Sequence, residues 1–188
     1  MVMHSLVRCL TARLQKRPLL LSLSALGLLL LLVAGLMPGG LELRIVPLNS
    51  SRPLLVLPLE PGELFTLQYV HSVEKAPIWE VHSVDAAGRI YIEEERYLTF
   101  GAGMGRMPGV GRLVRRGAYE VITDMHRPTG DFVLRIGSPG VDHTLVWRGT
   151  RTNLSARAPH QAVTFSARPV SFLSQLWRMV APHEATPG

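Results

Sequence analysis

The sequence has 188 residues, a formal net charge of +6 and one cysteine. A chain of this length normally forms one domain. The tail before residue 37 holds four basic residues and no acid, so it carries +4, whereas the remainder sets 16 basic against 14 acidic residues and carries only +2. A domain that binds duplex phosphates concentrates more positive charge than this, so nucleic acid is not an expected partner.

The first feature in chain order is an uncharged apolar run at residues 18–37. Twenty residues in a helix measure about 30 Å, which is the thickness of the hydrocarbon layer of a bilayer. We therefore predict a transmembrane anchor at residues 18–37, preceded by a basic cytoplasmic tail at residues 1–17. The basic flank predicts that the chain beyond about residue 40 lies on the opposite side of the membrane.

A cleaved signal peptide is the alternative to an anchor, because residues 33–35 (Val-Ala-Gly) offer small side chains at a suitable spacing. The apolar run is longer than the roughly 7–15 residues of such a signal, which favours the anchor. The only cysteine, Cys9, lies in the tail, so the exported part has no disulfide and depends on its core for stability.

Residues 43–169 alternate between apolar and polar side chains in short segments separated by turn residues, which is typical of strands. We predict an all-β domain, an antiparallel β-sandwich or barrel of about eight strands, because no long helical period interrupts them. The expected strands lie within residues 62–72, 77–84, 88–100, 119–137 (two strands), 142–149, 152–158 and 162–169.

A short amphipathic helix is predicted at residues 170–180, after the last strand. Its apolar residues recur at helical spacing and form one stripe, which we expect to cover the β domain; a membrane-surface role is the alternative. The stripe consists of Phe172, Leu173, Leu176, Trp177 and Val180.

The candidate binding residues begin in the segment Tyr69–Glu80, which we predict to be a β-hairpin around a turn near Pro77. If paired residue numbers sum to 151, His71 faces Glu80 closely enough for an ion pair, and if they sum to 150 it faces Trp79. An ion pair would raise the pKa of the histidine and could serve a pH response, an anionic ligand or stability.

Catalytic and metal-binding signals are weak in this segment. His71 and Ser72 are adjacent, so on a regular strand they point to opposite faces, and the sequence has no G-x-S-x-G motif. The possible metal ligands His71, Glu80, His82 and His143 follow no H-x-H or H-E-x-x-H spacing. We therefore expect no metal and no cofactor, and histidine and serine that satisfy a turn are the plainer interpretation.

The glycine-rich segment at residues 100–117 is predicted to be a loop, and it contains no G-K-[ST] phosphate-binding motif. Its arginines suit a carboxylate, a phosphate or an acidic partner surface. The candidate anion or partner contacts are Arg106, Arg112, Arg115 and Arg116.

Two linked motifs, "YVHSVEKAPIWEVHSVD" and "EEERYLTFGAGMG", resemble the signature of the bacterial domain of unknown function 1850 family. The resemblance covers about residues 43–168, and it departs from the family after Gly103. A later His-x-Leu, at His143 and Leu145, also fits. The residues that match the motifs and enter the candidate binding set are His71, Ser72, Glu80, Glu95, Gly101, Gly103 and His143.

The resemblance implies a small exported or membrane-anchored protein, and it implies a link to transport, because family members are often encoded beside the fused permease of TRAP-type transporters with a TAXI-type solute-binding protein. We therefore expect a single-pass protein of the bacterial inner membrane with a periplasmic β domain. Its expected role is that of a transporter accessory that contacts the permease, the solute-binding protein or its carboxylate ligand. The alternative function is an exported hydrolase or metal-dependent enzyme centred on His71 and Glu80.

Overall fold

The structure, a computed structural model, describes residues 21–98 and 109–180. The chain divides into two compact units, Gly40–Val170 and a second one made of Met1–Gly39 with Ser171–Gly188. The second unit contains a helix at residues 21–36 and the C-terminal helix α3 (Phe172–Val180). Within the described ranges, no helix has both the length and the apolar character needed to cross a membrane.

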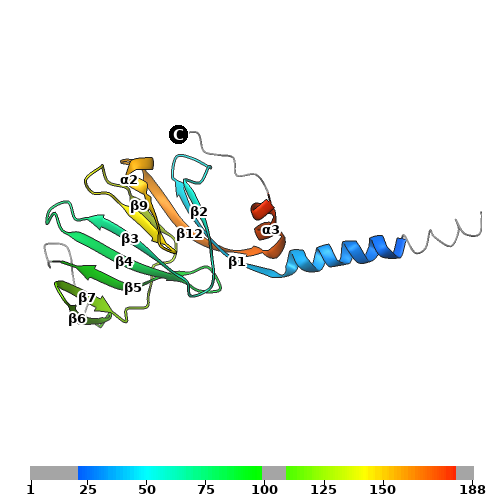
Figure 1. The fold of residues 1–188 in the computed structure, drawn as a ribbon, viewed down its shortest axis with the longest axis horizontal. Coiled ribbons are helices and arrows are strands. Elements are labelled where there is room, and N and C mark those ends of the chain that lie inside the picture. The colour runs from blue at the N-terminus through cyan, green and yellow to red at the C-terminus, as the bar shows by residue number, and fades with distance from the viewer. Residues whose placement is uncertain (1–20, 99–108, 181–188) are drawn as a thin grey trace, which may run out of the picture. The chain divides into compact units, whose positions relative to one another are not determined.

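The β domain consists of two sheets with antiparallel pairing (Figure 1). The smaller sheet has the order β2 (Leu55–Leu59), β1 (Pro38–Pro47), β12 (Ala162–Ser171) and β9 (Phe132–Arg135). The larger sheet runs through β11 (Thr150–Asn153), β10 (Thr144–Trp147), β3 (Leu64–Val70), β4 (Pro77–Val84), β5 (Ile90–Tyr97), β7 (Tyr119–Thr123) and β6 (Arg112–Arg116). The two-residue strand β8 (Arg127–Pro128) also pairs with β5.

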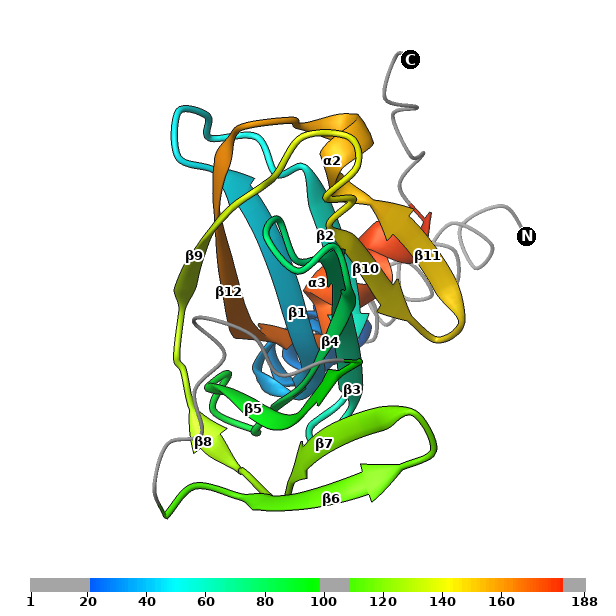
Figure 2. The same ribbon diagram turned by 90° about the vertical axis from the view of Figure 1, so that its left-hand side faces the viewer.

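The inner faces of the two sheets enclose a common hydrophobic core. Every second residue of β1 points inward, so Leu41, Leu43 and Ile45 are buried while the residues between them are polar. Figure 2 shows β1 and β12 side by side in the smaller sheet, with β3 and β4 in the other sheet. The core residues from both sheets include Leu41, Leu43, Ile45, Leu59, Val163 and Phe165 together with Phe65, Leu67, Val84, Ile90 and Leu145.

The predicted antiparallel all-β fold with a short C-terminal helix is confirmed, but about eight strands was too low a number. The described residues contain twelve strands. Two of the strands missed, β1 and β2, lie before the first segment expected to form a strand, and β6 lies in the segment interpreted as a loop.

The strand expected at residues 152–158 is wrong for most of its length. Asn153 ends β11 and acts as the N-cap of the short helix α2 (Leu154–Arg157), because its side-chain oxygen accepts a hydrogen bond from the amide of Ala156 at 2.9 Å. Asparagine is among the preferred helix caps, and this local bond competes with continued strand pairing.

The structure describes α3 and the β domain as parts of separate units, so the predicted cover of the β domain by the apolar stripe stays a prediction. Four of its five residues are classed as exposed, namely Phe172, Leu176, Trp177 and Val180.

The core of the β domain gives a direct stability test in two leucines close in sequence. Leu43 is fully buried in β1, whereas Leu48 lies just beyond β1 and is 61% exposed. We expect Leu43→Ala to lower the free energy of unfolding by about 2–5 kcal/mol, because it leaves a cavity between the sheets. Leu48→Ala, the matched control, should change it by less than about 0.5 kcal/mol. Urea denaturation measures both, and equal effects would contradict the assigned core.

Candidate functional site

The hairpin predicted around "YVHSVEKAPIWE" is present, but its register differs from both alternatives considered. Strands β3 and β4 pair so that residue numbers sum to 147, from Leu64 with Ser83 to Val70 with Pro77. Glu80 therefore faces Leu67, and neither the 151 nor the 150 register is correct. The expected cross-strand pair of His71 with Glu80 is absent from the described ladder of these strands.

The turn between the strands explains this register. The amide of His71 donates to the carbonyl of Ala76 at 2.8 Å, and the amide of Lys75 donates to the carbonyl of His71 at 2.9 Å. The ring Nδ1 of His71 accepts a hydrogen bond from the amide of Glu74 at 3.1 Å. These three bonds close a loop wider than the tight turn that the 151 register requires. His71 thus stabilises the turn, as the plainer interpretation held, and Ser72 is exposed in the same loop.

A different group of polar residues converges on the inner face of the larger sheet. In antiparallel strands, paired residues share a face, and residues two apart share it too. Because Glu80 pairs with Leu67 on one side and with Glu95 on the other, both carboxylates lie on the face that carries the core. We call this group the Glu80 cluster; its members are Tyr69, Glu80, His82, Glu95, Tyr97 and His143.

Two tyrosines hold the two carboxylates. The hydroxyl of Tyr69 donates to Oε1 of Glu80 at 2.8 Å, and the hydroxyl of Tyr97 donates to Oε2 of Glu95 through a short hydrogen bond. Burial and the neighbouring carboxylates raise the pKa of Tyr69 and of Tyr97 far above the usual value for tyrosine. Both hydroxyls therefore remain protonated donors.

His82 occupies an unusual place between the two sheets. Its ring is stacked between Phe65, at 5.0 Å between centroids, and Phe132 of the smaller sheet, at 5.5 Å. The residue is 2% exposed, and neither ring nitrogen makes a hydrogen bond. Nε2 lies 3.5 Å from Oε2 of Glu80, which is within range of an ion pair but long for a hydrogen bond. The sequence pattern had suggested His82 only as a possible metal ligand.

The charge on Glu80 is set by opposing effects. Burial favours the neutral acid, but contacts with His82 and Tyr69 and the nearby ring of His143 outweigh it, so the pKa of Glu80 lies below its usual value. The side chain keeps 26% of its exposure, so the carboxylate lies at the edge of the core and not deep inside it.

His143 completes the cluster from the start of β10. Its ring stacks on Tyr69 at 4.9 Å, and its Nδ1 accepts a hydrogen bond from the amide of Gly137 at 3.0 Å. Burial lowers the pKa of His143, although the charge of Glu80 opposes this. The neutral ring carries its proton on Nε2, because Nδ1 is the acceptor.

The cluster can hold a proton or a positively charged group, because it gathers two carboxylates. Burial disfavours the charged form of His143, and the ring nitrogens of His82 make no hydrogen bond, so neither histidine already neutralises both carboxylates. It does not suit the carboxylate ligand considered from sequence. Over residues 21–98 and 109–180, no three histidine, cysteine, aspartate or glutamate side chains lie close enough to hold a metal ion.

The remaining predicted residues are placed differently. Gly101, Gly103 and Arg106 lie outside the described residues. The other three arginines belong to β6, an edge strand, and not to a loop. Arg112 forms an ion pair with Asp124 at 3.1 Å, Arg116 forms one with Glu94 at 2.8 Å, and the side chain of Arg115 is exposed.

The fold and the cluster define a two-sheet antiparallel β domain with a partly buried acidic and aromatic site. Residues 65–154 match the model of the family described as "Domain of unknown function (DUF1850)", so the chain carries a domain of that family. The matched segment includes every member of the Glu80 cluster. No curated protein and no solved structure matches the chain.

Sequence reasoning missed Tyr69 and Tyr97 as site residues and considered His82 only as a possible metal ligand. A period of two already places His82 on the face of Glu80 and Tyr97 on the face of Glu95. That signal was in the sequence, whereas the stack of His82 on Phe132 depends on packing between the sheets.

The bond between Tyr69 and Glu80 predicts energetic coupling. We expect Tyr69→Phe to lower the free energy of unfolding by about 1.5–3 kcal/mol, because a bond to a charged group is lost. Together with Glu80→Gln it should cost less than the sum of the two single changes. The matched control is Tyr119→Phe, since Tyr119 packs edge-on against Trp79 and not on Glu80. Additive costs for Tyr69 and Glu80 in urea denaturation would show that the two side chains do not interact.

The lowered pKa of His143 predicts a loss of stability in mild acid. Below about pH 6.5 the unfolded chain takes up this proton more readily than the folded one, so the free energy of unfolding falls as pH falls, until the folded pKa is reached. One such group contributes a slope of at most about 1.4 kcal/mol per pH unit.

The substitution His143→Asn isolates this contribution, because the side-chain oxygen of the asparagine can still accept the hydrogen bond from the amide of Gly137 but does not titrate. Denaturation curves between pH 7.5 and 5 should show a shallower decline for the variant than for the wild type. The lowered pKa of Glu80 makes the free energy of unfolding depend on pH only below about pH 4.3, so it does not contribute to the slope between pH 7.5 and 5. An unchanged slope would contradict the burial of this histidine as a neutral ring.

Proposed function

We propose that this protein is a membrane-anchored accessory of a TRAP-type (TAXI) solute transporter, with its β domain in the bacterial periplasm. The single observation that carries the anchor is the surface of the helix at residues 21–36. The five consecutive leucines 28–32 are each 56–61% exposed. Five consecutive residues at about 100° each pass all the way round a helix, so it is apolar on every side, which suits a lipid environment.

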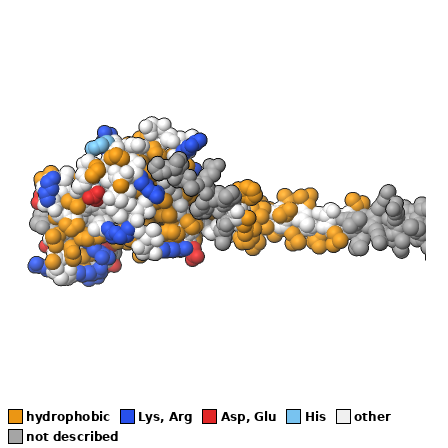
Figure 3. All heavy atoms as spheres, turned by 45° about the horizontal axis from the view of Figure 1, so that its top comes forward, with side chains coloured by type: hydrophobic (Ala, Val, Ile, Leu, Met, Phe, Trp, Pro, Cys, Tyr) orange, Lys and Arg blue, Asp and Glu red, His pale blue; other side chains and the backbone are white. Residues whose placement is uncertain are grey.

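The sequence extends this apolar surface and supports the orientation. The uncharged run reaches from Pro18 to Met37, and four basic residues precede it without any acid. Basic residues remain on the cytoplasmic side, which supports a periplasmic β domain. Figure 3 shows hydrophobic side chains along the described part of this helix.

The transporter assignment rests on what the family resemblance implies, namely that members are often encoded beside TRAP permeases. Within the β domain, all three arginines of β6 are exposed, and Arg115 offers a contact for an acidic partner surface, since Arg112 and Arg116 already pair within the domain. The Glu80 cluster would then serve the domain as a stabilising or proton-holding element. A hydrolase centred on His71 and Glu80 lacks support, because each of these residues has other partners.

Extraction from bacterial membranes tests this proposal. We expect the full-length chain to stay in the membrane after an alkaline carbonate wash, and protease added to spheroplasts to degrade the β domain. In mild detergent, the permease or the solute-binding protein should co-purify with it. Arg115→Glu should weaken this association, whereas Arg135→Glu, an exposed arginine of β9 in the other sheet, is the matched control.

Each outcome separates one part of the proposal. Release by carbonate would contradict the anchor, and protection of the β domain in spheroplasts would contradict its periplasmic location. An anchored chain that purifies without any transporter component would contradict the accessory role.

A further inference from the structure

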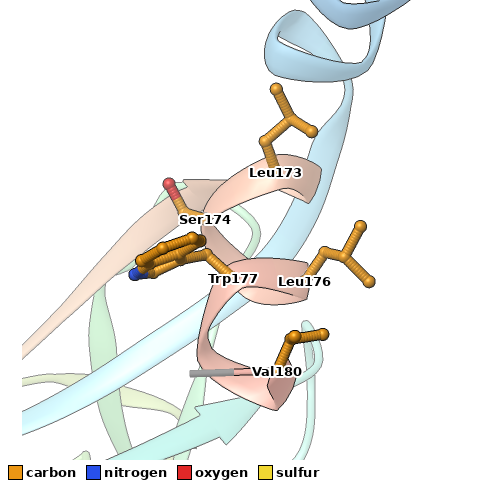
Figure 4. A pocket seen from close by; sticks show the side chains of 5 residues that line it. All are labelled: Leu173, Ser174, Leu176, Trp177 and Val180. Carbon is orange, nitrogen blue, oxygen red and sulfur yellow. The ribbon is translucent and has the colours of Figure 1, made fainter. Parts of the chain in front are cut away.

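The C-terminal helix α3 presents an exposed apolar surface. Trp177 is 73% and Val180 is 74% exposed, and Phe172 and Leu176 are exposed as well. An apolar hollow along the helix is lined by Leu173, Ser174, Leu176, Trp177 and Val180, and Figure 4 shows these side chains projecting from α3. Large exposed apolar patches of this kind mark sites of interaction with a partner or a membrane.

The start of α3 is fixed beside the end of the helix at residues 21–36, within the same compact unit. The amide of Phe172 donates to the carbonyl of Met37 at 2.9 Å. At Gly39 an added Cβ would lie 2.5 Å from the carbonyl of Ser171, so only glycine permits this approach. Near the end of the first helix, a Cβ on Gly35 would be 3.4 Å from Leu173. The apolar face of α3 thus begins where the apolar run ends.

We propose that α3 lies in the interface of the same lipid bilayer that holds residues 21–36, with its apolar face inserted between the headgroups; this rests on the proposed membrane anchor. Nine residues measure about 14 Å, too short to cross a bilayer, so the helix lies along the surface. Tryptophan is enriched at this depth, because its ring is apolar and its N–H prefers water.

Continuity with the anchor favours lipid over a protein partner. A bilayer that contains residues 21–36 is already present where Met37 leaves it, and the bond from Phe172 to Met37 keeps α3 at that level. The helix has no acidic residue to repel anionic headgroups and one arginine, Arg178, in its sequence.

Fluorescence quenching by brominated lipid tests this placement. The full-length protein is reconstituted in phosphatidylcholine–phosphatidylglycerol vesicles whose acyl chains carry bromine either near the headgroup or near the bilayer centre. We expect the shallow bromines to quench tryptophan emission more strongly than the deep ones. Trp177→Phe should remove most of this quenching, whereas Trp79→Phe, the matched control in β4, should leave it in place.

The outcomes distinguish this inference from the anchor itself. Protein that floats with the vesicles and resists carbonate, but shows no quenching that depends on Trp177, overturns the interfacial placement while the anchor stands; a protein partner would then be what covers α3. Protein that fails to stay with the vesicles overturns both. Equal quenching by shallow and deep bromines also contradicts a helix at the surface.

Discussion

The pairing register of β3 and β4 determines the arrangement of the β domain. Shifting the pairing by one residue would turn the side chains of one strand to the opposite face of the sheet. Phe65 and Leu67 therefore share the core face with Glu80 and His82 only in registers whose paired residue numbers sum to an odd number. The sum of 147 keeps them inside and also fixes which residues lie opposite them. Consequently Glu80 enters the core face opposite Leu67, and His82 enters it opposite Phe65, so both polar side chains need partners there.

Those partners explain why polar groups are tolerated at the edge of the core. Tyr69 and Tyr97 donate to the carboxylates, and the ring of His82 replaces a hydrophobic side chain in a stack that continues from Phe132 to Phe165. The same packing joins the two sheets. The other unit presents the opposite case, since apolar side chains there lie uncovered on both of its described helices. The core that stabilises the β domain and the membrane contact that we propose thus belong to different parts of the chain.

The sequence predicted much of the fold, because alternation and turn residues act locally. The hairpin, the antiparallel all-β class and the family were all accessible from Phe65, Leu67, Pro77 and the motifs that follow. The register was not, because it depends on how the backbone of His71 bonds to Ala76 and how its ring accepts from Glu74. The cap at Asn153 was overlooked for the same reason, since a single side-chain bond ended a strand. The stacking of His82 required contacts between sheets that no local pattern contains.

Cross-strand proton contacts measure the register most directly. The amide of Val70 donates to Val141, away from β4, and Pro77 opposite it has no amide proton, so this pair is not hydrogen-bonded. Pairs alternate along the ladder, so Gln68 and Trp79 are also a non-hydrogen-bonded pair with closely spaced Hα atoms. The structure predicts a strong nuclear Overhauser effect between the Hα atoms of Gln68 and Trp79. The same contact from Gln68 to His82 or Ser83 instead would show another register and contradict the assignment of the Glu80 cluster.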